Sequence, residues 1–339
     1  MKRHFTALYA LLLAIVPSAC SMHGQSTTPS LPPYTQNIVQ PFDTSGGISN
    51  MAVRVGDAAP AFFGNRLSGI NLAFSEIDAV DSAGHNVVVG QYSTPLIVNL
   101  LKYQDGLGAN VGQTQVSQKT YQQIRFVIDT SASSVLYTGG ASAGLRFVRN
   151  NDHSSANAGG ATSTTSLGHG RVAITVSQPF AIGSTASELV NVDFNLMESL
   201  TPPSIDTNRG QGNNLASDTH GGLALAVRPT LFVAANSNGG QITGTVVNSR
   251  GNGVSNAVVV AVDQNGQVGN TVATDASGNF LLHTLAAGTY RLDIYNNYTN
   301  SAGANFSSEG SSSDRSRLKG STTVTVSPAQ VTDAGTITD

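Results

Sequence analysis

The fold is decided by a stretch that reads Arg171-Val172-Ala173-Ile174-Thr175-Val176-Ser177. Successive side chains of an extended chain point to opposite sides, so Val172, Ile174 and Val176 share one side and polar residues share the other. This period of two predicts a β-strand with one side in an apolar core and the other side in water.

The same alternation occurs at residues 124–128 and 190–196. In the second segment we expect the apolar residues to face a core, and Asn191, Asp193 and Asn195 to lie on a solvated sheet face. Beyond the N-terminal leader no comparable stretch carries an apolar stripe of period 3.6, although residues 94–103 are compatible with a helical turn. The sequence therefore predicts an all-β fold.

The composition agrees with that prediction and limits the partners. Glycine is abundant, with 36 residues, and tryptophan is absent, as is typical of strands and turns. The formal net charge is −3 and charged residues make up only 11% of the chain, so no basic field attracts phosphate backbones and we expect no nucleic-acid partner. The single cysteine excludes an intramolecular disulfide.

The N-terminus has the features of a bacterial export leader. Lys2 and Arg3 precede an apolar run over residues 5–16, which is shorter than the roughly 20 residues of a membrane span. Pro17-Ser18-Ala19-Cys20 follows, and small residues before a cysteine resemble the lipobox of bacterial lipoproteins, although Pro17 departs from the usual aliphatic residue. We predict that Cys20 carries a lipid and becomes the mature N-terminus of a cell-envelope protein; ordinary signal cleavage is the alternative.

The chain after the leader is expected to form a tether and two domains. Residues 21–41 contain no Asp, Glu, Lys or Arg, and prolines at positions 29, 32, 33 and 41, which is typical of a flexible tether. At roughly 150 residues per domain, the length of 339 residues predicts about two domains. Asn236-Ser237-Asn238-Gly239-Gly240 is interpreted as a short flexible junction. The expected ranges are a signal peptide at 1–19, a tether at 20–47, and β-sandwich-like domains at 48–235 and 240–339.

Ser21, directly after the predicted lipidation site Cys20, resembles the residue found there in outer-membrane lipoproteins.

The first domain contains four characteristic segments: Val53-Arg54-Val55-Gly56-Asp57, Tyr121-Gln122-Gln123-Ile124-Arg125-Phe126, Val192-Asp193-Phe194-Asn195 and Val227-Arg228-Pro229. On these segments, residues 51–233 resemble a bacterial family known as domain of unknown function 4382. The resemblance implies a secreted β-rich domain without an established activity, although Asn195 stands where the family has Asp.

The second domain, residues 241–339, contains four characteristic segments, at 242–247, 253–260, 274–280 and 285–292. On these segments it resembles the carboxypeptidase regulatory-like domain, a transthyretin-like sandwich grouped with carbohydrate-binding-like folds. It implies a supporting or binding module without catalytic residues. The third segment also makes physical sense, because Gly278 suits a turn that needs positive φ, Asp275 can cap that turn, and Phe280 then enters the core.

One motif has the spacing of a catalytic nucleophile. Gly140-Ala141-Ser142-Ala143-Gly144 matches the G-x-S-x-G pattern of hydrolases, in which the serine lies between a strand and a helix. Here a strand-like segment follows, and His153 and His169 lie in low-complexity loops, so we interpret the motif as a turn. Likewise, the glycines of residues 106–112 are expected to form a turn and not a dinucleotide site.

The chain offers weak candidates for ligand binding. Residues 206–210 place oxygen donors as a calcium loop does, without the closing acidic residue. Asp193 could hold a cation only if loops supplied more oxygens, and the seven histidines lack zinc-site spacing. Tyr295 and Tyr298, beside several asparagines, are candidates for sugar or peptide binding, with ordinary surface tyrosines as the alternative. We therefore expect no metal, no cofactor and no catalytic residues.

Three functions remain open at this point. The first is a non-catalytic, membrane-anchored envelope lipoprotein that binds carbohydrate or another envelope component. The second is a structural spacer without a ligand. The third is a hydrolase that uses Ser142.

Overall fold

The alternating residues 171–177 form the strand β9 (Arg171–Ser177), in which Ile174 and Val176 are buried and Arg171 and Ser177 are exposed. The computed structural model describes residues 47–57, 67–104, 106–147, 161–200, 215–217, 223–295 and 318–339. All of these belong to one compact unit. The predicted lipidation site Cys20, the leader, most of the tether, His153, residues 206–210 and Tyr298 lie outside the described residues.

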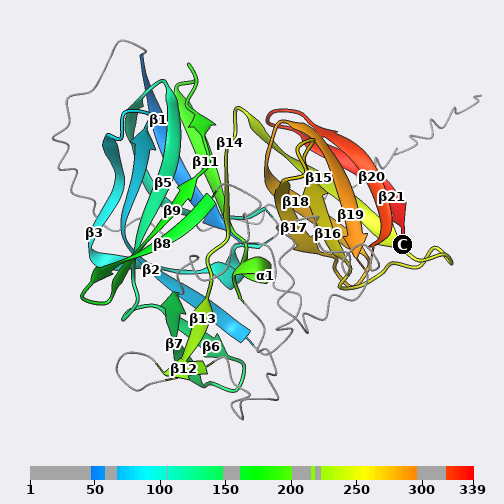
Figure 1. Ribbon diagram of the computed structural model, residues 1–339, viewed down its shortest axis with the longest axis horizontal. Helices are drawn as coiled ribbons and strands as arrows, with labels where there is room; N and C mark the ends of the chain where they lie inside the picture. Colours follow the sequence, from blue (N-terminus) through cyan, green and yellow to red (C-terminus); the bar gives the residue numbers. More distant parts are fainter. Residues whose placement is uncertain are drawn as a thin grey trace, which may run out of the picture. The chain divides into compact units, whose positions relative to one another are not determined.

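The first domain contains a four-stranded sheet with the order β14-β11-β1-β4 (Figure 1). Its central strand β1 pairs in parallel with β11 and antiparallel with β4. These strands are β1 (Ile48–Gly56), β4 (Ala109–Ser117), β11 (Ser187–Phe194) and β14 (Leu231–Ala235).

A second, ten-stranded sheet completes this domain. Its main path is β12-β13-β7-β6-β2-β5-β9-β8, and β3 and β10 pair with β2 and β5. Side chains from both sheets share one apolar core, which includes Met51, Phe74, Phe126 and Val190. The remaining strands are β2 (Leu67–Asp81), β3 (Asn86–Asn99), β5 (Thr120–Asp129), β6 (Ser134–Tyr137), β7 (Ser142–Phe147), β8 (Ala161–Gly168), β10 (Phe180–Ala181), β12 (Leu215–Ser217) and β13 (Leu223–Val227).

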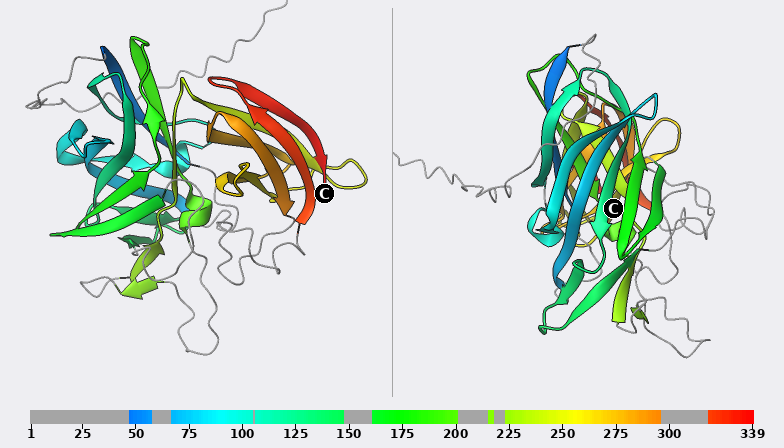
Figure 2. Two further views of the ribbon diagram at one scale, coloured as in Figure 1. Left: turned by 45° about the horizontal axis from the view of Figure 1, so that its top comes forward. Right: turned by 90° about the vertical axis from the view of Figure 1, so that its left-hand side faces the viewer.

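The second domain is a smaller sandwich of two sheets, with the orders β18-β15-β21 and β17-β16-β19-β20. Its core includes Val259, Phe280 and Leu292. The two terminal strands β20 and β21 lie side by side where the sheets meet (Figure 2). The strands are β15 (Gly239–Val247), β16 (Val258–Val262), β17 (Val268–Ala273), β18 (Asn279–Ala286), β19 (Gly288–Tyr295), β20 (Leu318–Val326) and β21 (Val331–Thr338).

The predicted turn before Phe280 is confirmed in detail. Gly278 has a φ of 85°, and a side chain there would collide with the carbonyl oxygen of Val246. The Asp275 carboxylate accepts hydrogen bonds from the backbone N–H groups of Ser277 and Asn279, both at 2.8 Å. Phe280 is buried. Glycine and aspartate are therefore used here for conformation and capping.

Helical structure is limited to short segments within the described residues. The 3-10 helix Leu100–Lys102 confirms the helical turn expected in residues 94–103, and α1 (Leu196–Ser199) is a single turn. In the part of the chain that the structure describes, no helix has the length and apolar character needed to span a bilayer. The predicted all-β fold is confirmed.

Candidate binding site at the domain junction

The connection between the two domains is a hydrogen-bonded turn. β14 ends at Ala235 and β15 begins at Gly239. The backbone N–H of Asn236 donates to the Leu189 carbonyl at 2.8 Å, and that of Ser237 donates to the Glu188 carboxylate at 2.8 Å. The segment interpreted from sequence as a flexible junction is thus tied to β11.

The prediction that Asp193 and Asn195 face solvent is wrong. Both residues are 0% exposed, because strand β17 of the second domain covers this side of β11. The Asn270 side-chain amide donates to the Asp193 carboxylate at 2.6 Å, and the Asn195 amide donates to the Asn270 amide oxygen at 3.0 Å. Asn195 also donates to the Thr271 hydroxyl at 3.0 Å. The two domains therefore share a buried polar network, and Asp193 receives a donor where a cation would have to bind.

His283 extends this network from strand β18. The residue is 7% exposed, with Nε2 3.8 Å from the Asp193 carboxylate and Nδ1 2.9 Å from the Thr284 hydroxyl. Thr284 has a φ of 60°, a left-handed conformation that β-branched residues rarely adopt. Strained backbone of this kind costs of order 1–3 kcal/mol and clusters at functional sites.

Beside the network lies a cavity of about 130 Å³ that residues from both domains line. β1 and β11 contribute from the first domain, and β15 and β18 contribute from the second. None of the described lining residues is an aspartate or glutamate. The polar side chains among the described lining residues are those of Arg54, Asn191, Asn236, Gln241, His283, Thr284 and Gln330.

One buried acidic group of the first domain, Asp78, is held in an ion-pair cluster. The Arg125 guanidinium donates to Asp78 through Nε at 2.8 Å and to Glu76 at 2.9 Å. Burial raises the pKa of Asp78 to about 6, with Arg125 opposing and Glu76 reinforcing the increase. These interactions join β2 to β5 inside the ten-stranded sheet, so we assign them a structural role.

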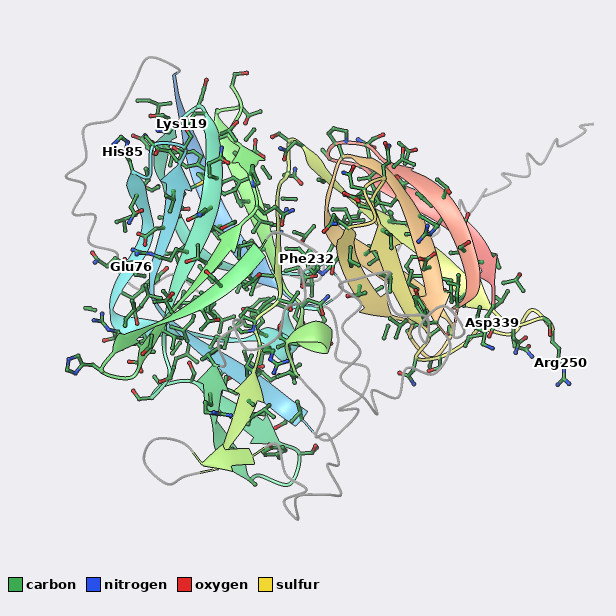
Figure 3. The ribbon with its side chains drawn as sticks, in the orientation of Figure 1. Glu76, His85, Lys119, Phe232, Arg250 and Asp339 are labelled. Atoms are coloured by element: carbon green, nitrogen blue, oxygen red, sulfur yellow. The ribbon has the colours of Figure 1, made fainter. Side chains whose placement is uncertain are left out.

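A second ion-pair cluster lies at one end of the same domain, where His85 and Lys119 are found (Figure 3). Lys119 Nζ lies 2.7 Å from Asp81, whose carboxylate also accepts backbone N–H bonds from Ala83 and His85. Burial opposes the effect of these donors, but together they lower the pKa of Asp81. Both clusters use their charges for cross-strand contacts and turns.

The G-x-S-x-G motif is a turn followed by a strand. Gly140 has a φ of 83°, and Ser142 is exposed at the start of β7. His169 occupies the tight turn between β8 and β9. The glycine-rich segment at 106–112 likewise turns at Gly106, with a φ of 77°, and runs into β4. The interpretation of both motifs as turns is confirmed.

Most of the junction residues are not recognisable from the sequence. Arg54, Asn270 and His283 come from three separate strands, and only the packing of the two domains brings them together. One signal was present in the sequence: Asn270 lies within an apolar strand, between Val268 and Val272, where asparagine is unfavourable unless its amide has partners.

Comparison with protein-family models assigns both domains. Residues 49–213 match the model of a domain of unknown function (DUF4382). Residues 241–338 match the carboxypeptidase regulatory-like domain. Both predicted families are confirmed, in the predicted order. No curated protein matches the chain.

Comparison with solved structures finds weak similarity to pilins and to one other bacterial protein. The major pilin subunit BcpA of Bacillus cereus is 11% identical, with 86% of this chain and 99% of that chain covered and a TM-score of 0.24. The shaft pilin SpaA of Lactobacillus rhamnosus GG is 10% identical, with 86% and 96% covered and a TM-score of 0.22. The Bacillus anthracis TIE protein is 7% identical, with 84% of this chain covered and a TM-score of 0.21, and the chain spans 39% of that protein. TM-scores this low support no functional argument.

Proposed function

We propose that this protein is a non-catalytic binding protein of the bacterial cell envelope, anchored through a lipid on Cys20, and that it binds carbohydrate in the cavity at its domain junction. The observation that carries the proposal is the cavity itself. Both domains line it, its walls are rich in polar side chains, and it lies against a strained backbone position at Thr284. Concave sites with convergent polar groups at domain interfaces are common ligand sites.

The sequence supports the location. A positive segment, a short apolar run and small residues before Cys20 are typical of an exported lipoprotein, and the proline-containing stretch after it suits a tether. An acyl-modified cysteine with more than one chain holds a protein firmly at a membrane, because each buried CH₂ contributes about 0.8 kcal/mol.

The described residues also favour binding over catalysis. Asp78 and Asp81, the acidic groups with the clearest pKa shifts in the first domain, form ion pairs with Arg125 and Lys119 across strands. Ser142 begins a strand and not the helix that a nucleophile elbow requires. A binding role uses the polar cavity without needing a nucleophile.

A glycan array tests the proposal. The full-length protein, purified in an amine-oxide detergent that carries no sugar, should be retained by at least one glycan. Asn236→Trp places a large side chain at the cavity and should abolish retention. Asn252→Trp, in an exposed turn that does not line the cavity, is the matched control and should be retained like the unmodified protein. If no glycan retains the unmodified protein, or if Asn236→Trp is retained equally well, the proposal is wrong.

A further inference from the structure

We infer that the ligand of the junction cavity is an acidic sugar, a hydroxylated carboxylate of the uronic-acid type, and that Arg54 binds its carboxylate. This inference rests on the proposed function, since it names the ligand chemistry of the same cavity.

Arg54 brings a positive charge to the cavity. Arg54 is half-buried in the middle of β1, and its Nε is buried without a hydrogen-bond partner among the described residues. Arg125 and Arg291, by contrast, each donate to a carboxylate of a neighbouring residue. The described lining contains no carboxylate to pair with Arg54, and the Asp193 carboxylate beside the cavity accepts a hydrogen bond from Asn270. A carboxylate on a ligand would supply a partner for Arg54.

The guanidinium of Arg54 has a shape that matches a carboxylate. A guanidinium presents N–H donors in a planar fork that matches both oxygens of a carboxylate. The Arg54 stem packs over Gly108, where any side chain would collide with its Cγ and Cδ. This contact restricts the arginine and reduces the conformational entropy that binding would cost.

The rest of the described lining is rich in amide side chains. Asn191, Asn236, Gln241 and Gln330 each carry an amide that can donate and accept hydrogen bonds. Sugar hydroxyls also donate and accept, so several amides around one cavity match a polyhydroxylated ligand better than a simple anion. The volume of about 130 Å³ limits the enclosed part of the ligand to no more than a single ring, since an apolar cavity of about 150 Å³ holds benzene.

Calorimetric titration with D-glucuronate, D-glucose, acetate and inorganic phosphate tests the inference on the full-length protein in amine-oxide detergent. We expect glucuronate to bind at least tenfold more tightly than each of the other three probes. Arg54→Met keeps the stem but removes the charge, and should weaken glucuronate binding at least tenfold more than it weakens glucose binding. Arg171→Met, on the exposed side of β9, is the control and should bind glucuronate like the unmodified protein.

A second variant covers the case in which Arg54→Met does not fold. Gln241→Ala should weaken glucuronate and glucose binding by a similar factor, because an amide contacts hydroxyls that both sugars carry. Equal affinity for glucuronate and glucose, or full affinity in Arg54→Met, would overturn the role of Arg54. Acetate or phosphate binding as tightly as glucuronate would overturn the sugar assignment.

The experiments distinguish carbohydrate binding in the cavity from the preference for an acidic sugar. If the array retains the protein on a neutral glycan, and Asn236→Trp removes that retention, the inference about acidic sugars is wrong and the proposed function stands. If no glycan retains the protein, both are wrong.

Discussion

The two domains hold their charged and polar residues in different ways. In the first, Arg125 and Lys119 pair with Asp78 and Asp81, which are respectively 47 and 38 residues away in sequence. In the second, side-chain oxygens of Asp and Asn accept backbone N–H bonds from residues two or four positions further on, as at Asn248, Asp263, Asp275 and Asp333. Even the ion pair of this domain, Arg291 with Asp293, is local. Among the described residues, the first domain therefore adds long-range ion pairs to local turns such as those at Asp81 and Asp129, whereas the second holds its charged and polar residues mainly through turns encoded within a few residues.

The largest expected effect comes from removing a long-range partner. At pH 8, Arg125→Ala should destabilise the protein by about 3–5 kcal/mol, because the Asp78 carboxylate is 1% exposed and would be left as a buried charge without its arginine partner. Arg171→Ala, an exposed arginine on the adjacent strand, should change stability by less than about 0.5 kcal/mol. Urea unfolding measures both. A loss below about 1 kcal/mol for Arg125→Ala would contradict the contrast between the domains.

The same cluster predicts a pH dependence. Because the pKa of Asp78 is raised from 3.8 to about 6 in the folded protein, the folded state binds the proton more tightly than the unfolded state, and stability should fall as the pH rises from about 4 to about 6. At about 1.4 kcal/mol per pKa unit, the fall is up to about 3 kcal/mol.

The lowered pKa of Asp81 has the opposite effect on stability. The stabilisation that Asp81 provides is present above about pH 4 and is lost below it, so a change in stability between pH 4 and pH 7 reports on Asp78. Urea unfolding across that interval should give a flat profile for Asp78→Asn. A slope equal to that of the unmodified protein would exclude Asp78 as its source.

In the second domain, the turn at Gly278 should give a slightly smaller effect. Gly278→Ala should cost about 2–3 kcal/mol, since a left-handed conformation costs an alanine about 1–2 kcal/mol and the new methyl group would also collide with the Val246 carbonyl. Gly251 has a similar φ of 79° with open space around it, so Gly251→Ala should cost only about 1 kcal/mol. Equal losses for the two variants would mean that the collision is relieved by local movement.

The smallest expected effect concerns a single cap. Asp275→Ala should cost about 1 kcal/mol, because the side chain accepts two backbone hydrogen bonds in an exposed turn. Asp275→Asn keeps an acceptor and should retain most of that stability. Thermal unfolding of the two variants distinguishes a cap from a charge effect: losses of the same size in both would indicate that the charge matters and the acceptor does not.

The contrast between the domains also explains what could be predicted from the sequence. The strand of residues 171–177 and the turn of Asp275, Gly278 and Phe280 follow from local rules, and both were predicted correctly. The burial of Asp193 and Asn195 was not, because their alternation with apolar residues is the same whether water or a second domain covers that face. The cavity depends on the same long-range packing, so the sequence could not indicate Arg54 or His283 as its lining.

The central claim is that the two domains form a single unit through the buried network around Asn270, which donates to Asp193 and to the His283 carbonyl. Scanning calorimetry of the unmodified protein and of Asn270→Ala tests it most directly. We predict one cooperative transition for the unmodified protein, and two separate transitions for Asn270→Ala, with the first at a lower temperature. Two independent transitions in the unmodified protein, neither of them moved by Asn270→Ala, would contradict the claim.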